Sequence, residues 1–132
     1  MSEREILFRG KIIELCKYQG QWLEGFFGSD NGKTFIAIQN ENGLNGYFCD
    51  SKTVGRYTGL TDKNGTRIFE GDIVNALWFG KVERAFVCYA EDYLMWVLKY
   101  SDDEHNDMNL FFKNDIKVIG NIYDNPELLK GD

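Results

Sequence analysis

Short apolar runs that alternate with glycine-containing turns are the feature that most limits what this chain can fold into. Runs rich in Ile, Val, Phe, Tyr and Trp recur along the sequence, and the 132 residues include 14 Gly but only 1 Pro. Three Asn-Gly pairs, at 31–32, 42–43 and 64–65, fall between such runs. Both residue types accept the positive φ that two-residue hairpin turns require. The pattern therefore predicts a mostly β protein of antiparallel strands, with little helix.

Ten strands are expected, each bounded by turn residues. Their approximate ranges are 4–14, 21–27, 33–39, 44–49, 54–58, 66–78, 81–90, 93–100, 108–112 and 115–123. The single Pro lies in the segment YDNPELL, near the carboxyl terminus. Asn125 is placed to cap a helix, Pro126 to take its first position and Glu127 to complement its dipole, so a short C-terminal helix is predicted.

Size and composition indicate one globular domain over residues 1–132. A chain of this length buries roughly two thirds of its unfolded surface. With 43% hydrophobic and 15% aromatic residues, it is too apolar for a disordered chain of net charge −6. The first residues, MSEREILFRGK, carry charges where a signal peptide needs an apolar run, and the longest apolar run, 93–98, is far too short to span a membrane. We therefore expect a cytoplasmic protein that does not engage a membrane.

The acidic charge is concentrated in the second half of the chain. Residues 1–60 carry 7 basic and 7 acidic side chains, whereas residues 61–132 carry 8 basic and 14 acidic, a net charge of −6. A surface of this sign repels phosphate groups. Direct binding of nucleic acid is therefore not expected.

The segment TDKNGTRIFEGD, residues 61–72, resembles a calcium loop because acidic and amide side chains surround a glycine. An EF-hand loop that starts at Asp62 needs Gly at its sixth position and Glu at its twelfth, where this chain has Arg67 and Ile73. The flanking segments are strand-like, whereas an EF-hand needs helices. The pattern favours a hairpin turn with exposed polar residues over a metal site.

Residues 27–34, FGSDNGKT, end like a phosphate-binding loop. Three residues separate Gly28 from Gly32, where the phosphate-binding motif has four, and the following FIAIQ alternates like a strand. No helix N-terminus is then available to hold phosphate. A hairpin turn is predicted instead.

The remaining residue types with reactive chemistry do not form a recognisable set. His105 is the single histidine and stands among acidic residues, which favours a solvated loop. Cys16, Cys49 and Cys88 are odd in number and have no C-x-x-C spacing, which indicates buried structural thiols in a reducing compartment. We predict no catalytic, cofactor-binding or metal-binding residue, and no cofactor.

Four segments carry a resemblance to a known family. They are REILFRGK at 4–11, QWLEGFF at 21–27, TVGRYTGLTDKNGTRIFEGDIV at 53–74 and VIGNIYDNPELL at 118–129. In this order they resemble the YopX-like family of phage and prophage proteins. The resemblance implies a mostly β intracellular protein and supplies no catalytic residue.

The resemblance also refines the expected architecture. GDIV at 71–74 resembles the start of the first strand in many SH3-like barrels, and Gly59, Gly65 and Gly71 recur every six residues, which suits a bent sheet. The expected fold is a small, strongly bent antiparallel sheet or an SH3-like barrel, with an additional β hairpin region and a short C-terminal helix. The domain is single, or it divides into an N-terminal β part, 1–60, and a barrel part, 61–132.

Three classes of function are compatible with these features. The first is a non-catalytic interaction or assembly protein, which self-associates or binds a host or phage protein. The second is an acidic protein that acts on nucleic-acid machinery, as a DNA mimic or an SH3-like binding module. The third is an enzyme of unrecognised type that uses paired carboxylates. The first class is favoured because no catalytic set is recognisable.

A homo-oligomer interface is predicted in residues 81–100. Alternate strand residues face opposite sides, and both sides of this segment are apolar, which indicates a sheet covered on both faces. The cover comes from a second copy of the chain or from the chain itself. The candidate interface residues are Ala85, Val87, Tyr89, Tyr93, Met95 and Val97.

Overall fold

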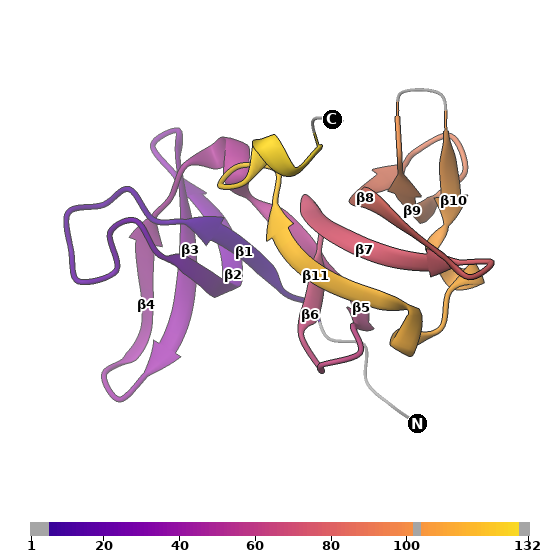
Figure 1. Ribbon diagram of the computed structural model, residues 1–132. Coiled ribbons are helices and arrows are strands. Elements are labelled where there is room, and N and C mark those ends of the chain that lie inside the picture. Colours follow the sequence, from indigo (N-terminus) through magenta and orange to yellow (C-terminus); the bar gives the residue numbers. More distant parts are fainter. Residues whose placement is uncertain (1–5, 102–103, 130–132) are drawn as a thin grey trace. The chain divides into compact units, whose positions relative to one another are not determined.

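The computed structural model describes residues 6–101 and 104–129, and its described part consists mainly of antiparallel strands (Figure 1). The mostly β fold predicted from the sequence is confirmed. The chain divides into two compact units, Met1–Tyr57 and Thr58–Asp132. This division lies close to the boundary of the two-part alternative, 60/61.

The strands of the first unit belong to a six-stranded sheet in the order β4-β3-β2-β1-β5-β6, in which β6 (Arg67–Phe69) follows β5. Its strands are β1 (Phe8–Lys11), β2 (Trp22–Asp30), β3 (Lys33–Asn40), β4 (Gly43–Phe48) and β5 (Gly55–Thr61), and the 3-10 helix η1 (Ser51–Thr53) precedes β5. β5 continues into the second unit from Thr58 onward. The buried residues Ile12, Ile36 and Cys49 form the centre of this unit's core.

The hairpin between β2 and β3 confirms the turn predicted at residues 31–32. Asn31 has φ of 50° and Gly32 has φ of 79°. Both central residues therefore adopt the left-handed backbone conformation that a two-residue hairpin turn requires. Lys33 and Thr34 are the first residues of β3 and pair with Asp30 and Ser29. The GKT segment is therefore part of a hairpin.

The second unit contains a five-stranded antiparallel sheet in the order β10-β9-β8-β7-β11. The strands of the unit are β6 (Arg67–Phe69), β7 (Asp72–Trp78), β8 (Lys81–Ala90), β9 (Met95–Lys99), β10 (His105–Asp107) and β11 (Ile116–Asn121). Three 3-10 helices complete it, namely η2 (Met108–Leu110), η3 (Lys113–Asp115) and η4 (Pro126–Leu129). The last of these confirms a short helix that starts at Pro126.

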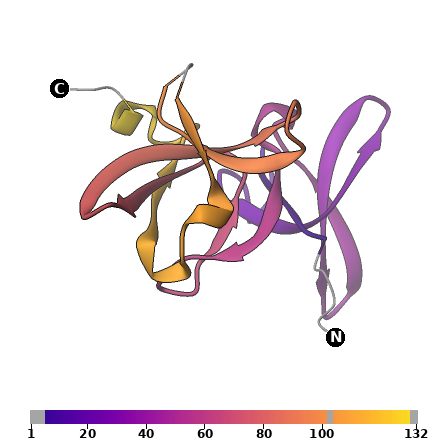
Figure 2. The same cartoon turned by 90° about the vertical axis from the view of Figure 1, so that its right-hand side faces the viewer.

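The five-stranded sheet is curved but open (Figure 2). Among the described residues, the edge strands β10 and β11 do not pair with each other, so the sheet does not close into a barrel. β10 has only three residues, and the chain passes through η2 and η3 before β11 begins. Of the two predicted architectures, the bent sheet is the one observed.

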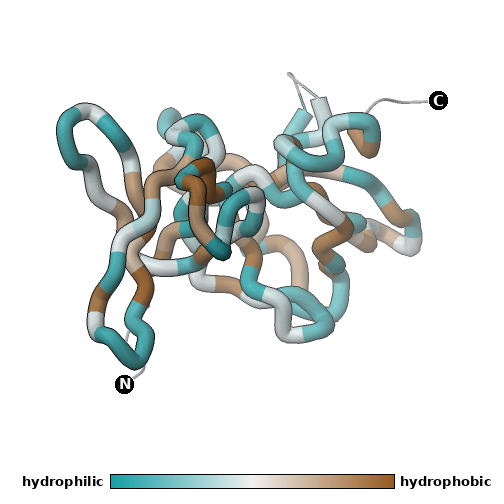
Figure 3. The backbone as a smooth tube through the Cα atoms, turned by 90° about the vertical axis from the view of Figure 1, so that its left-hand side faces the viewer, coloured by the Kyte–Doolittle hydropathy of each residue, from teal (hydrophilic) through white to brown (hydrophobic). Residues whose placement is uncertain are grey.

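The core of the second unit lies on one face of its sheet. Hydrophobic and hydrophilic residues alternate at short intervals along the backbone (Figure 3). The buried cluster consists of Ile68, Val74, Ala76, Ala85, Val87, Leu98, Met108, Phe111 and Ile116. We call the face that carries this cluster the core face and the other the outer face.

Several predicted strand boundaries were wrong for local reasons. Residues 66–78 form two strands because the chain turns at Gly71, whose φ is 91°. Residues 108–112 begin with the 3-10 helix η2, where the Asp107 side chain accepts a hydrogen bond from the Asn109 N–H. His105 lies in strand β10 and not in a loop.

Candidate functional site

Asp62, in the loop that resembles a calcium site, is a buried carboxylate that holds the backbone together. Its Oδ1 accepts hydrogen bonds from the N–H groups of Asn64 and Thr66, and its Oδ2 accepts one from Val118, each at 2.9 Å. Burial alone raises the pKa of Asp62, but the three N–H groups and the charge of Lys117 outweigh it and lower the pKa below its usual value. The carboxylate is therefore ionised at neutral pH and committed to the backbone.

Asp72 has a matching structural role at the other end of this segment. It is buried, and its Oδ2 accepts a hydrogen bond of 2.8 Å from the Phe69 N–H. The prediction of exposed polar side chains was wrong for Asp62 and Asp72. Both are buried, and each carboxylate accepts hydrogen bonding from backbone N–H groups. In the described part of the chain, no three His, Cys, Asp or Glu side chains are grouped as metal ligands.

The predicted interface residues do not share one face of the sheet. Strands β8 and β9 pair with Val87 opposite Leu98 and Cys88 opposite Val97. Directly opposed residues of an antiparallel pair point to the same side, so Val87 and Val97 lie on different faces. The alternation places Ala85, Val87 and Tyr89 on the core face and Met95 and Val97 on the outer face.

Half of these residues are covered within the chain itself. Ala85 and Val87 belong to the buried cluster, and Val97 is 2% exposed. Tyr93 lies in the turn before β9 and is 59% exposed. Strand β9 begins at Met95 instead of Tyr93, because the preceding Leu94 has φ of 53°. The exposed apolar surface in this segment is therefore smaller than the sequence pattern indicates.

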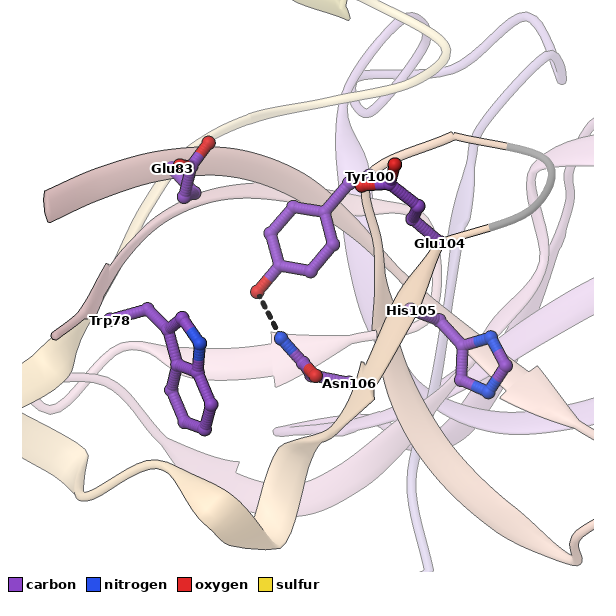
Figure 4. A pocket seen from close by; sticks show the side chains of 6 residues that line it. All are labelled: Trp78, Glu83, Tyr100, Glu104, His105 and Asn106. Carbon is purple, nitrogen blue, oxygen red and sulfur yellow. Dashed lines mark hydrogen bonds between the residues drawn. The ribbon is translucent and has the colours of Figure 1, made fainter.

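An open depression of about 480 Å³ lies in the second unit (Figure 4). It combines two aromatic rings, two carboxylates, an amide and an imidazole. The lining residues are Trp78, Glu83, Tyr100, Glu104, His105 and Asn106. Its volume is in the range of small-ligand sites.

The strand register brings most of this lining to the core face. Glu83 lies opposite the buried Ala76, and Asn106 lies opposite the buried Leu98. Trp78 lies two residues after Ala76 on β7, and Tyr100 lies two residues after Leu98, just past the end of β9. Both aromatic side chains therefore point to the core face as well. The depression is thus a continuation of the core face beyond the packed cluster.

Neighbouring contacts hold the rings in place. The Trp78 ring packs against Phe111 with ring centroids 5.0 Å apart, and Asn106 Nδ2 donates a hydrogen bond of 3.0 Å to Tyr100 Oη (Figure 4). Phe111 belongs to the buried cluster, so this contact fixes the Trp78 ring against the core. The aromatic part of the depression is therefore preformed.

The charged groups of the depression are open to water. Glu104 is exposed, and Glu83 Oε1 lies 3.9 Å from Lys81 Nζ, with both side chains well exposed. His105 points away from the space between the two aromatic rings, and its ring lies 5.6 Å from that of Tyr93 (Figure 4). Among the described residues, the lining includes no Ser, Thr, Cys or Lys, and so no nucleophile of these types. The arrangement is suited to binding.

None of these residues was singled out from the sequence as a site. Trp78 and Glu83 stand on either side of the hairpin turn at Phe79 and Gly80, which have φ of 50° and 76°. A turn at this position was predicted, and it makes Trp78 and Glu83 neighbours on one face. The contribution of Tyr100 and Asn106 depends on the pairing of β9 with β10, which the sequence did not reveal.

The cysteines take no part in this site. Cys49 is buried, as predicted, while Cys16 and Cys88 are half-buried. Burial raises the pKa of the Cys49 thiol, and the nearby Asp50 raises it further. Burial also raises the pKa of Cys88. A raised pKa keeps a thiol protonated and unreactive, which fits a structural role.

The family model described as YopX protein matches residues 8–130. The chain belongs to the YopX family. This confirms the family inferred from the four sequence segments, and the YopX match extends over both units. A comparison with curated proteins gives no match.

The fold of this YopX chain is also similar to a solved structure. The crystal structure of protein EF1440 from Enterococcus faecalis superposes with a TM-score of 0.58 at 23% sequence identity, covering 97% of this chain and 100% of that one. At this identity the likeness concerns the fold. Within the described residues, no helix is long and apolar enough to cross a membrane.

Proposed function

We propose that the protein is a non-catalytic interaction protein of the bacterial cytoplasm, encoded by a phage or prophage, and that the depression of the second unit is its binding surface. The observation that carries this proposal is the convergence of Trp78 and Tyr100 on an open space that is bordered by exposed polar groups. Trp, Tyr and Arg dominate the energetics of protein–protein interfaces. A preformed aromatic surface also binds with a small loss of side-chain entropy.

The exposure of the carboxylates supports binding over catalysis. General acid–base groups act most effectively where water is excluded and where a neighbouring group orients them. Glu104 is exposed, and the contact between Glu83 and Lys81 is long and open to solvent. Acid–base chemistry at this position would have little protection from bulk water.

Affinity capture with paired variants tests the proposal. A tagged wild-type chain is compared with the double variant Trp78→Ala/Tyr100→Ala, and Phe112→Ala is the matched control because Phe112 is an aromatic residue that is 80% exposed and does not line the depression. The expected result is a bacterial or phage protein that the wild type and the control retain and the double variant loses. A bound set that is the same for all three chains, or empty for the wild type, contradicts the proposal.

A further inference from the structure

The lining of the depression has the composition of a site for a cation. Trp78 and Tyr100 line the depression, and aromatic ring faces attract positive charge, most strongly in the case of Trp. Glu83 and Glu104 add carboxylates, which form charge-assisted hydrogen bonds with cationic donors. Neither an anion nor a purely apolar group would use both features.

The surrounding charge favours the same ligand. Residues 61–132 carry 14 acidic and 8 basic side chains, so the segment that forms the depression has a net charge of −6. Such a field raises the local concentration of cations and speeds their association. Lys81 Nζ lies 3.9 Å from Glu83 Oε1, and the Lys81 side chain is 81% exposed. A ligand cation can therefore displace Lys81 from Glu83 at little cost.

The combination of aromatic rings and carboxylates in the lining favours a guanidinium group over an ammonium group. A guanidinium is planar, stacks on aromatic faces, is weakly hydrated and presents several donors to carboxylates. It can contact an aromatic ring and a carboxylate together, whereas an ammonium group is a compact and strongly hydrated charge. The volume of about 480 Å³ exceeds what one side chain fills, which leaves room for the adjoining backbone of a protein segment.

We propose that the depression binds an arginine side chain in a basic segment of a partner protein, with the guanidinium between the aromatic rings and Glu83 or Glu104. This rests on the proposed function and names the chemistry of the partner. Trp78 and Tyr100 supply the stacking contacts, and the carboxylates select the charge. Lys81 competes for Glu83 in the free protein.

Nuclear magnetic resonance with a matched pair of probes tests the assignment. The full chain, labelled with nitrogen-15, is titrated with Nα-acetyl-arginine amide and, separately, with Nα-acetyl-citrulline amide, which has nearly the same shape without the charge. The indole N–H signal of Trp78 is assigned from its loss in Trp78→Phe. The expected result is a saturable shift of this signal with the arginine probe, with a dissociation constant on the order of 1 mM, and no shift with the citrulline probe.

Three variants sharpen the test. Trp78→Ala, followed through the backbone amide signals of the other lining residues because it lacks the Trp78 indole, should weaken binding of the arginine probe at least about fivefold, and Glu83→Gln/Glu104→Gln should weaken it at least about threefold. Lys81→Gln should strengthen binding about twofold, because it removes the competing cation. The carboxylate and Lys81 variants change exposed side chains, so they keep the test valid if Trp78→Ala does not fold.

Equal shifts with both probes, or arginine-induced shifts confined to residues outside the depression, would overturn the assignment. Unchanged affinity in Glu83→Gln/Glu104→Gln would do the same. The capture experiment separates this failure from that of the proposed function. If capture still depends on Trp78 and Tyr100 while the arginine probe does not bind, the interaction surface stands and the arginine assignment falls. If neither is observed, both fall.

Discussion

Replacing Asp62 by Asn is the perturbation that tests most sharply how this fold is held together. Asp62 Oδ1 accepts hydrogen bonds from the backbone N–H groups of Asn64 and Thr66. Its Oδ2 accepts one from the N–H of Val118, which is 56 residues away in sequence. The variant Asp62→Asn keeps one oxygen for the turn. Its amide group then meets the Val118 N–H, so that two donors face each other.

The magnitude follows from the number of bonds affected. A hydrogen bond to a charged acceptor contributes about 1.5–3 kcal/mol, and a buried N–H left unpaired costs about 1–3 kcal/mol. Because one of the three bonds to Asp62 is lost and the other two lose their charge, Asp62→Asn should destabilise the protein by about 2–4 kcal/mol. This is a large part of the free energy of unfolding of an ordinary domain, about 5–15 kcal/mol.

The effect should depend on pH in a defined direction. The pKa of Asp62 is lowered in the folded state, whereas an unfolded Asp has a pKa of about 3.9. The stabilisation is therefore complete above about pH 5 and is lost as the pH falls through the folded-state pKa. The difference in stability between wild type and Asp62→Asn should shrink in acid.

Urea unfolding followed by tryptophan fluorescence, at about pH 7, 5 and 3, measures this difference. Asp92→Asn, at an exposed position in the turn between β8 and β9, is the matched control and should change stability by less than about 0.5 kcal/mol. If Asp62→Asn lowers the free energy of unfolding no more than the control does, the structural role given to this carboxylate is refuted. A decrease in this free energy that is the same at pH 7 and pH 3 would refute it as well.

Three further predictions concern the turns, the first unit and the oligomeric state. Gly65→Val should lower the free energy of unfolding by about 1–2 kcal/mol, because Gly65 has φ of 80°; unchanged urea stability would contradict this. Gly28→Ala should cost about 1–3 kcal/mol, because an added Cβ would lie 2.4 Å from Phe35 Cζ and the ring must move; a neutral effect on thermal unfolding would show that it moves freely. Light scattering coupled to size exclusion should give a multiple of 15.3 kDa, because self-association is expected through the surface near Tyr93 and Met95; a monomer mass would exclude this.

Features encoded by a few neighbouring residues could be predicted from the sequence. The Asn31-Gly32 hairpin follows from two residues that tolerate positive φ, and the short helix at Pro126 follows from the fixed φ of proline. The mostly β composition follows from the apolar runs between such turns. Each of these features depends on local conformational preferences.

Features that depend on pairing between distant segments could not be predicted. Asp62 looked like an exposed turn residue because its third partner, Val118, is brought to it by the pairing of other strands. The predicted interface combined Val87 with Val97, but the register of β8 and β9 sends them to opposite faces. The depression needs the pairing of β7 with β8 and of β9 with β10 at once, and a shift of one residue in either would turn its side chains away.

The affinity of the captured partner for defined variants tests the central claim most directly, namely that the depression of the second unit is the interaction surface. Isothermal titration calorimetry measures the dissociation constant of the purified partner with wild type, Trp78→Ala and Phe112→Ala. Truncation of a central aromatic anchor commonly costs 2 kcal/mol or more, so Trp78→Ala should weaken binding about 30-fold, while Phe112→Ala should leave the constant within about twofold. Equal affinities of the wild type and Trp78→Ala would contradict the claim.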